Sequence, residues 1–357
     1  MIFPLERDLW RYLRDTDKTV VLYGMGNGAD KILNICDSFG IEVADFFASD
    51  GFVRGHSFHG KTVLSYGQVK EKYGADNLIV RLSFASCLPS VLSQIEAVAQ
   101  ECELYAPDVP VCGDTLFDFS FARAHGEELR RVWELLADEE SRRIYEAVIA
   151  YKLTGRIDLL RSAESERERV YRELLDAATI GAAADLGAYN GDTIRELMTY
   201  APQLSTVFAM EPDRRNFKKL EQWLEGIESP VVHSFFGAAW SEDATLIFGD
   251  SGNRNAGVFA PGRQVEVHAK SLDSFVGGGW VDYVKYDVEG AEREALNGSR
   301  QVISRCRPRL LISAYHRSED IFSLPLQLHE MAPDYRLYYR RYPYVPAWDL
   351  NLIALPD

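Results

Sequence analysis

Residues 183–193 read AADLGAYNGDT, and they decide the fold of the C-terminal half of this 357-residue chain. A short apolar run ends at Asp185. Gly187 and Gly191 then mark a turn before a helix that is expected to begin at Asp192 or Thr193. In a parallel α/β sheet, ligands bind in the crevice where such a strand end meets the next helix. Glycine lets the backbone approach a ligand closely, so we predict a Rossmann-like sheet with its site at this turn.

The charge of the turn indicates the kind of ligand. Asp185 and Asp192 flank it, and no Lys or Arg lies between them. Two carboxylates repel a pyrophosphate, whereas they suit a ligand that carries an ammonium group and sugar hydroxyls. S-adenosylmethionine is such a ligand.

Two later strand ends are also acidic. Glu211 closes the apolar run TVFAM, 26 positions after Asp185, and an acid at the end of the second strand typically binds ribose hydroxyls. Asp287 and Glu289 follow the run VDYVKY at residues 281–286. We expect all three strand ends to face one crevice.

These segments resemble the FkbM-type S-adenosylmethionine-dependent methyltransferases, a class I methyltransferase family. The motifs occur in the family's order, as DLGAYNGDT (185–193), MEPD (210–213), SLDSF (271–275), KYDVEGAE (285–292), RPRLLIS (307–313) and AYH (314–316). The resemblance covers about residues 176–357, and KYDVEGAE is its most specific part. It implies a class I sheet that ends in an antiparallel hairpin, and oxygen as the methyl acceptor. Many members carry Glu at the position of Ala314, so we give position 314 no catalytic role.

The cofactor assignments follow from the turn, the strand ends and the resemblance. Asp185 is expected to contact the methionine ammonium, directly or through water, and Glu211 the ribose, with small residues after a strand at 231–236 beside the adenine. For Asp192, a role as helix N-cap without ligand contact is equally open. The predicted cofactor-binding residues are Asp185, Gly187, Ala188, Tyr189, Asn190, Gly191, Asp192, Thr193, Glu211, Pro212, Ala238 and Asp287.

The acceptor side is predicted around residues that follow two neighbouring strands. An aliphatic hydroxyl is a poor nucleophile and needs a base or a metal-bound alkoxide. We predict His316 as base, Asp287 as orienting group and Lys285 as stabiliser of oxyanion charge, with Glu289 and Tyr315 binding substrate. The alternatives are salt bridges from Lys285 and a His316 that only bonds backbone. No metal is assigned: a divalent ion at Asp287, Glu289 and His316 stays open, because spacing does not indicate it.

Residues 1–120 are predicted to form a second Rossmann-like domain. Gly24, Gly26 and Ala29 fit G-x-G-x-x-A after the run KTVVLY, and Asp45 lies about 20 residues further on. The loop could bind NAD or a nucleotide-sugar with Asp45 on a ribose, or its glycines could only permit close packing. This part resembles the small domain that often precedes FkbM-type enzymes, which implies substrate recognition or dimerisation, and hence a homo-oligomer.

Residues 121–178 show apolar positions at helical spacing and are predicted to be a helical connector to a methyltransferase domain at 179–357. Tyr145, Tyr151 and Arg156 are its candidates for the acceptor pocket. The polar stretch 251–262 is expected to be a loop over the site.

Composition excludes several classes of function. The net charge of −15 and the sequence pI of about 5.0 argue against a nucleic-acid partner. Neither a membrane span nor a signal peptide is recognised. The five scattered cysteines form no C-x-x-C pair, which indicates reduced thiols in a cytoplasmic protein without a zinc site.

The preferred hypothesis is an S-adenosylmethionine-dependent O-methyltransferase acting on a small-molecule, sugar or polyketide-like hydroxyl. One alternative is an NAD- or nucleotide-sugar-dependent enzyme acting through the N-terminal glycine loop. The other is a non-catalytic scaffold that binds S-adenosylmethionine.

Overall fold

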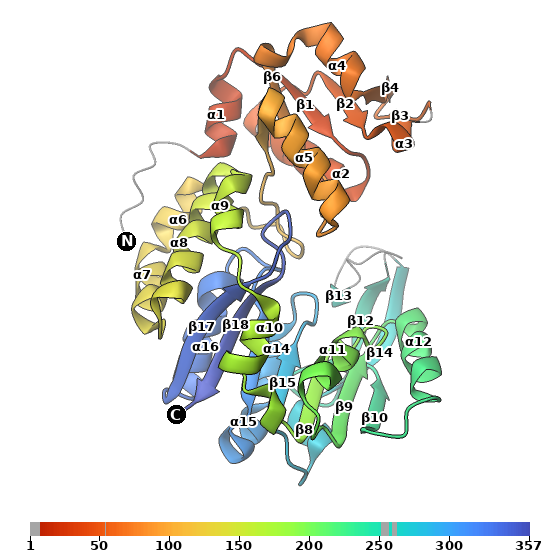
Figure 1. Cartoon of the computed structure of the whole chain (residues 1–357), viewed down its shortest axis with the longest axis vertical. Helices are drawn as coiled ribbons and strands as arrows, with labels where there is room; N and C mark the ends of the chain where they lie inside the picture. The colour runs from red at the N-terminus through yellow and green to blue at the C-terminus, as the bar shows by residue number, and fades with distance from the viewer. Residues whose placement is uncertain (1–7, 54, 251–256, 259–262) are drawn as a thin grey trace.

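The structure is a computed structural model that describes residues 8–53, 55–250, 257–258 and 263–357. One α/β unit lies at the top of Figure 1 and a larger one at the bottom, with a group of helices between them on one side. The predicted α/β fold class, with two Rossmann-like sheets and a helical connector between them, is confirmed.

The N-terminal unit is a five-stranded, wholly parallel sheet in the order β5-β2-β1-β6-β7. Its central strands are buried along their whole length, as β-branched runs covered by helices on both faces should be. The strands are β1 (Thr19–Tyr23), β2 (Asp45–Ala48), β5 (Leu64–Ser65), β6 (Leu78–Leu82) and β7 (Glu103–Tyr105), with a small β3 (Ser57–Phe58) and β4 (Lys61–Thr62) pair. The helices are α1 (Leu9–Asp15), α2 (Asn27–Phe39), α3 (Asp50–Val53), α4 (Tyr66–Tyr73) and α5 (Pro89–Glu101).

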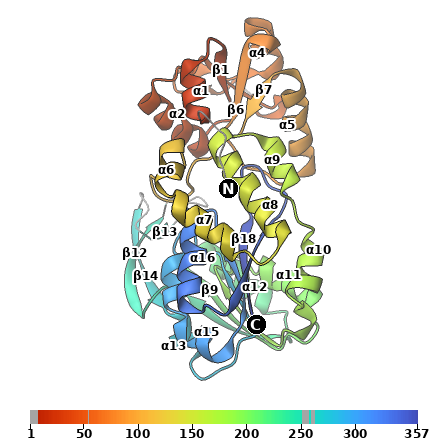
Figure 2. The ribbon, with the colours of Figure 1, turned by 90° about the vertical axis from the view of Figure 1, so that its left-hand side faces the viewer.

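The connector is a series of helices, and capping residues mark where its longest helix begins and ends. Asp138 accepts a hydrogen bond from the Ser141 backbone N–H at the start of α8, and Gly155 ends that helix in the left-handed conformation. The elements are α6 (Phe119–Ala124), α7 (Gly126–Leu135), α8 (Glu139–Thr154), α9 (Ile157–Ser162) and α10 (Arg167–Arg169), then a π-helical turn η2 (Val170–Leu174) and a 3-10 turn η3 (Ala177–Thr179). Figure 2 shows α6, α7 and α8 stacked along one side of the molecule.

The C-terminal unit is a seven-stranded sheet in the order β10-β9-β8-β15-β16-β18-β17. β18 pairs antiparallel with both β16 and β17, so the predicted terminal hairpin of β17 and β18 is confirmed. Its strands are β8 (Ala182–Leu186), β9 (Thr206–Glu211), β10 (Val231–Phe236), β15 (Tyr283–Tyr286), β16 (Arg309–Ser313), β17 (Tyr335–Arg341) and β18 (Leu350–Pro356). Its helices are α11 (Asp192–Tyr200), α12 (Arg214–Leu224), α13 (Leu272–Val276), α14 (Glu292–Asn297), α15 (Arg300–Cys306) and α16 (Asp320–Met331).

A second, four-stranded sheet in the order β11-β14-β12-β13 was not predicted. It comprises β11 (Ala238–Ala239), β12 (Ala244–Asp250), β13 (Gly257–Val258) and β14 (Arg263–Lys270), on the right of Figure 1. Of the predicted loop at 251–262, residues 257–258 form β13, and the remainder lies outside the described residues.

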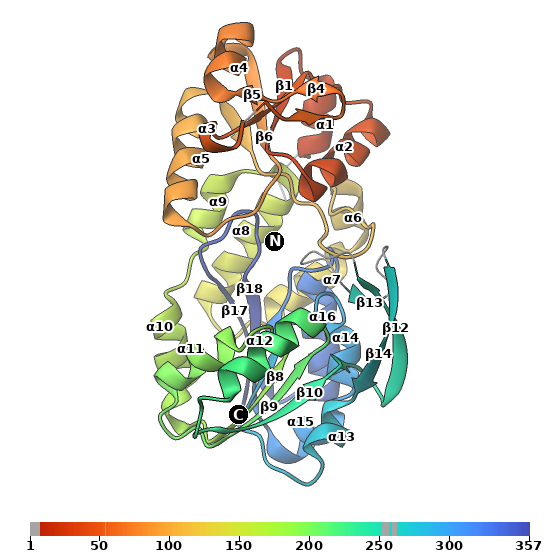
Figure 3. The same ribbon diagram turned by 90° about the vertical axis from the view of Figure 1, so that its right-hand side faces the viewer.

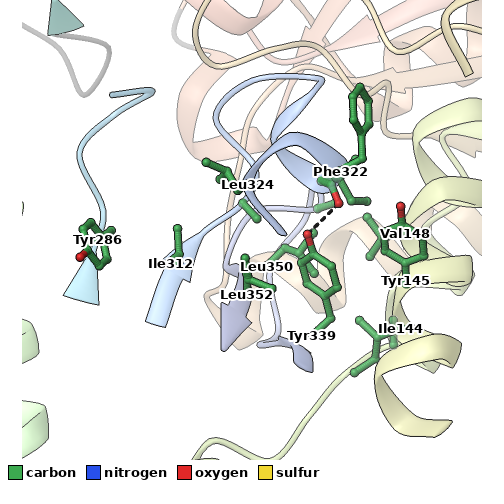
Figure 4. Close-up of a cluster of buried hydrophobic side chains, with 14 of the residues drawn as sticks. Ile144, Tyr145, Val148, Tyr286, Ile312, Phe322, Leu324, Tyr339, Leu350 and Leu352 are labelled. Atoms are coloured by element: carbon green, nitrogen blue, oxygen red, sulfur yellow. Dashed lines mark hydrogen bonds between the residues drawn. The ribbon is translucent and has the colours of Figure 1, made fainter. Parts of the chain in front are cut away.

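One apolar core joins all three parts of the chain. A single buried cluster runs from Val21 in β1 through the connector to Leu352 in β18. In Figure 4, Tyr145 of α8 lies beside Tyr339 of β17; the two rings stack with centroids 5.5 Å apart, and the Tyr339 hydroxyl donates to the Ile321 carbonyl oxygen. The connector thus covers the edge strand of the sheet, which would otherwise be open to pairing with another chain.

The N-terminal unit also contacts the C-terminal unit directly. The turn between β17 and β18 rises toward it (Figure 3), and Val345 in that turn forms a two-way backbone bridge with Ser86. Below α2, the Lys31 ammonium donates to the carbonyl oxygens of Pro110 and Val111 at 2.9 and 2.7 Å. Pro110 and Val111, in the segment that follows β7, are therefore hydrogen-bonded to α2 at the point where the chain passes from the N-terminal unit to the connector.

Among the described residues, no helix is both long enough and apolar enough to cross a membrane.

Candidate functional site

A cavity of about 1260 Å³ opens at the carboxyl ends of β8, β9, β15 and β16. It is where a doubly wound sheet places its ligands. Twelve of the residues singled out from the sequence line it, namely Gly187, Tyr189, Asp192, Thr193, Glu211, Pro212, Ala238, Lys285, Asp287, Glu289, Tyr315 and His316.

The two glycines of the first turn serve packing. Gly187 has φ +91°, and a Cβ there would lie 1.9 Å from the Asp287 carbonyl oxygen, so only glycine lets β8 and β15 end side by side. At Gly191, also with positive φ, a Cβ would meet the Trp223 ring at 2.5 Å. Gly191 therefore admits α12 rather than a ligand, and it does not line the cavity.

Three other predicted cofactor residues also lie behind the cavity surface. Ala188 is fully buried, and Asn190 is turned to Arg195, whose guanidinium donates to both its carbonyl and side-chain oxygens. Asp185 is buried, and one oxygen accepts a short hydrogen bond from the Thr193 hydroxyl. Burial raises the pKa of Asp185, although Lys285 and Thr193 oppose that rise.

Asp192 is not the helix N-cap. The N-cap position of α11 is Gly191, and Asp192 is the first helical residue, with its carboxylate accepting from the Thr193 backbone N–H at 3.0 Å. The capping interpretation of Asp192 was wrong, and its side chain borders the cavity at the helix N-terminus.

Glu211 sits at the end of β9 with both oxygens engaged by the backbone. It accepts from the N–H groups of Tyr189 and Asp213, each at 2.8 Å. Burial raises the pKa of Glu211 to about 7, because these two bonds only partly offset the loss of water. The carboxylate is thus fixed in position at the cavity wall.

Lys285 lies between two carboxylates. It is the register partner of Asp185 on the neighbouring parallel strand, and its ammonium lies 3.7 Å from Asp185 and 3.3 Å from Asp287. Burial alone would lower the pKa of Lys285, but the two carboxylates raise it. The predicted salt bridge is present, and it leaves Lys285 facing the cavity.

Glu289 does not continue the strand. β15 ends at Tyr286, and Glu289 lies in a turn with φ +53°. Asp287 and Glu289 therefore follow the strand and do not continue its alternation from Lys285. The turn nevertheless brings the Glu289 carboxylate to 3.5 Å from the Nε2 of His316.

His316 is 1% exposed and surrounded by carboxylates. Its Nδ1 lies 2.9 Å from Glu292, and its Nε2 lies 3.6 Å from Asp287 as well as 3.5 Å from Glu289. Burial alone would lower the pKa of His316, but Glu292, Glu289 and Asp287 raise it to about 10. Glu292 was missed because an acid in the first turn of a helix is ordinarily a dipole partner; no sequence signal showed that it turns inward.

The rim contains groups that sequence reasoning missed. Arg167 pairs with Glu196 and Asp349 and lies over the Tyr342 ring, 3.9 Å from its centroid. Val111 reaches the rim from the N-terminal side.

The three connector residues proposed for the acceptor pocket lie elsewhere. Tyr145 and Tyr151 are fully buried in the core, and Arg156 pairs with Asp158 beside a different cavity. The helical spacing of apolar residues predicted which face of α8 is buried, but it could not predict that this face packs against β17.

The N-terminal glycine loop is used for packing. A Cβ on Gly24 would lie 2.6 Å from the Ser83 hydroxyl, and one on Gly28 would lie 2.2 Å from the Ser83 carbonyl oxygen. Asp45 begins β2 instead of ending it, and it binds the Lys72 ammonium and the Tyr73 hydroxyl. The proposed ribose contact of Asp45 was therefore wrong, because the residue lies at the opposite edge of the sheet from the loop.

The chain was compared with known proteins. No curated protein matches it. Among solved structures, the methyltransferase FkbM from Methylobacillus flagellatus KT matches with a TM-score of 0.71 at 19% identity, covering 97% of this chain and 92% of that one. That coverage includes the N-terminal unit and the connector, so the whole architecture is shared.

Two further structures match more loosely and carry no argument. Precorrin-6y C5,15-methyltransferase from Geobacter metallireducens GS-15 has a TM-score of 0.34 at 13% identity, over 55% of this chain and 94% of that one. Fibrillarin from Aeropyrum pernix, solved with S-adenosyl-L-methionine, has a TM-score of 0.32 at 12% identity, over 52% and 76%.

Comparison with protein families gives a direct match to the C-terminal unit. The matched family is the methyltransferase FkbM domain, over residues 185–345, which begins at Asp185 and ends in the β17–β18 turn. Residues 185–345 are therefore similar to the methyltransferase FkbM domain.

Proposed function

We propose that the chain is an S-adenosylmethionine-dependent O-methyltransferase that acts on a hydroxyl group of a small molecule, sugar or polyketide-like compound. The observation that carries this proposal is that one cavity holds two sets of groups. Glu211 and the β8–α11 turn lie on one side, and Lys285, Asp287 and His316 lie on the other.

The first set fits the donor. One carboxylate oxygen of Asp185 is buried without a hydrogen-bond partner among the described residues, and the Lys285 ammonium at 3.7 Å is too far to donate to it. The ammonium of the donor's methionine part would supply that hydrogen bond. Glu211 would accept from ribose hydroxyls, and the small side chain of Ala238 leaves room for a base. These carboxylates would bind the ammonium and the sugar, and none would stabilise the sulfonium that loses its charge in the reaction.

The second set fits the acceptor. The acceptor oxygen would attack the methyl carbon in line; the methyl–sulfur bond breaks and its electron pair stays on sulfur, giving S-adenosylhomocysteine. The hydroxyl proton would pass to the Asp287 carboxylate, and not to His316 as the sequence predicted, because the surrounding carboxylates keep His316 protonated. Lys285 and the His316 imidazolium would stabilise negative charge on the oxygen, while Glu289 and Tyr315 would bind the rest of the acceptor.

Calorimetry tests the donor half. We expect S-adenosylhomocysteine to bind, NAD not to bind, and Glu211→Ala to weaken S-adenosylhomocysteine at least ~10-fold, the loss of one good charged hydrogen-bond contact. Glu221→Ala, which removes an exposed acid of α12, is the matched control and should leave affinity unchanged. Equal affinity for wild type and Glu211→Ala would remove the ribose assignment.

Methyl transfer to an acceptor panel tests the other half. Radiolabelled S-adenosylmethionine should label hydroxyl compounds, and the same compounds with the hydroxyl replaced by hydrogen should stay unlabelled. Asp287→Asn should lower kcat by about 10²-fold or more without abolishing donor binding, the scale of a lost acid–base partner. A chain that binds S-adenosylhomocysteine but turns over no hydroxyl compound would be the scaffold instead.

A further inference from the structure

The side chains around His316 form a small cluster of metal-ligand type within the larger cavity. Asp287, Glu292 and His316 each bring a potential ligand atom to within 4.8 Å of the others. They come from the ends of β15 and β16 and the start of α14, three elements packed in the core. The cluster is therefore held by the fold and not by flexible surface side chains.

The distances on the cavity side are those of adjacent ligands. The His316 Nε2 lies 3.6 Å from a carboxylate oxygen of Asp287 and 3.5 Å from one of Glu289. Both exceed a good N–H···O hydrogen bond of about 2.7–3.2 Å. Ligands about 2.1 Å from one ion, at roughly right angles or slightly wider, are separated by about 3.0–3.5 Å. The Asp287 and Glu289 carboxylates would therefore both border an ion bound to the His316 Nε2.

On the buried side of the ring, Glu292 is an ion-pair neighbour of the His316 Nδ1, and that nitrogen has no hydrogen bond of good geometry among the described residues. The Glu292 carboxylate lies 2.9 Å from the His316 Nδ1, and it also accepts from the Val288 N–H at 3.0 Å. Metal-binding histidines almost always present their other ring nitrogen to such a carboxylate, which fixes the tautomer and points the free nitrogen at the metal. Glu292 is 1% exposed, and its other oxygen has no hydrogen-bond partner among the described residues.

The neighbouring charges leave the cluster short of positive charge. Asp320 is buried near Glu292, and burial together with Glu292 raises its pKa to about 8. Arg317 is turned away, donating to the Gly290 carbonyl oxygen, and Lys285 is shared between Asp287 and Asp185. Asp287 thus faces both the Lys285 ammonium at 3.3 Å and the His316 ring at 3.6 Å.

We propose that this cluster binds one divalent cation, with the His316 Nε2 and the carboxylates of Asp287 and Glu289 as ligands and Glu292 as the residue that orients the ring. The mixture of one imidazole and two carboxylates suits Mn²⁺ or Mg²⁺ with water at the remaining positions. The ion's role rests on the proposed function: it would hold the acceptor hydroxyl as a metal-bound alkoxide beside the methyl donor. The binding site itself does not depend on it.

Manganese binding to the full chain tests the proposal without any turnover. The chain is freed of metal with EDTA, and free Mn²⁺ is measured by its paramagnetic resonance signal as Mn²⁺ is added. We expect one saturable site per chain in the wild type. His316→Gln and Asp287→Asn should weaken binding at least ~10-fold, and Glu292→Gln by about 10–100-fold, the range for carboxylates that orient a ligating histidine.

Glu266→Gln is the matched control, because Glu266 is an exposed acid that lines the same cavity outside the cluster. It should bind Mn²⁺ as the wild type does. The Asp287 side chain is 31% exposed, so Asp287→Asn keeps the test informative if the fully buried positions do not fold.

Absence of saturable Mn²⁺ binding, or equal weakening by Glu266→Gln and Asp287→Asn, would overturn the metal site. Either result leaves S-adenosylhomocysteine calorimetry in EDTA unaffected, so failure of the metal site and failure of the proposed function are distinguishable.

Discussion

Glu211 shows how a single buried acid links the site to stability. Its pKa is raised to about 7 by burial, above the ordinary value of 4.5. Such a group holds its proton in the folded chain at pH values where the unfolded chain has lost it, so its contribution to stability is complete below about pH 4.5 and is lost as the pH rises through 7.

The first prediction is therefore a pH slope that depends on Glu211. Between pH 5 and 7 the unliganded wild type should lose up to about 1.4 kcal/mol of unfolding free energy per pH unit from this residue. In Glu211→Gln that contribution to the slope should be absent. Urea unfolding at several pH values measures it, and parallel slopes for the two proteins would contradict the prediction.

A second prediction concerns Gly187. Gly187→Ala places a methyl group 1.9 Å from the Asp287 carbonyl oxygen at a φ of +91°, so β8 and β15 must separate. We expect a loss of more than about 2 kcal/mol in stability and no measurable S-adenosylhomocysteine binding. Gly226→Ala is the control, because its Cβ would have only one neighbour near 4 Å, the Trp223 carbonyl oxygen at 3.9 Å. Thermal melting and calorimetry report the two effects.

At the scale of elements, the segment after β7 passes between the two α/β units and closes one wall of the site. The Cys112 N–H donates to the His316 carbonyl oxygen at 2.8 Å, and its thiol contacts the Glu289 carbonyl oxygen at 3.0 Å. Burial and the nearby carboxylates raise the pKa of Cys112 to about 12, so its thiol should be inert while the segment is in place.

The third prediction is that Lys31 controls the exposure of Cys112. Lys31→Ala removes two charged hydrogen bonds to this segment, and local opening should become at least ~10-fold more frequent. Alkylation of Cys112, followed by mass spectrometry, should accelerate accordingly.

The control for Lys31 is Lys61→Ala. Lys61 also donates to two carbonyl oxygens, those of Val43 and Ala44, but entirely within the N-terminal unit. Cys112 should react at the wild-type rate in that variant. Equal acceleration in both variants would show that the segment is not held by Lys31.

For the whole molecule, the shared core predicts that the three parts unfold together. The fourth prediction is that Tyr145→Ala, which empties a fully buried site between α8 and β17, costs about 3–5 kcal/mol. Hydrogen exchange in β1 and in β16 should accelerate by similar factors. Trp280→Ala, at a position 56% exposed, should change neither. Acceleration confined to one unit would contradict a common core.

Features of the structure that depend on residues close together in the sequence could be predicted, and features that depend on distant segments could not. The β8–α11 turn, the acidic end of β9 and the hairpin β17–β18 were predicted because each is marked by neighbouring residues: glycine at a turn, an acid after an apolar run, alternation broken by proline. Asp45 and Gly191 were misassigned because their neighbours in space come from distant segments, Lys72 and Trp223 respectively.

The sequence by itself determined the order of strands and helices and the acidic, glycine-bearing strand ends, since periodicity and turn chemistry act over a few residues. Only the tertiary structure decided which charges meet. Glu292 lies beside His316, and Arg167 beside Asp349, because helix and strand packing converge there, not because their sequence positions are related. Burial then sets their protonation, and burial is a property of the assembled core.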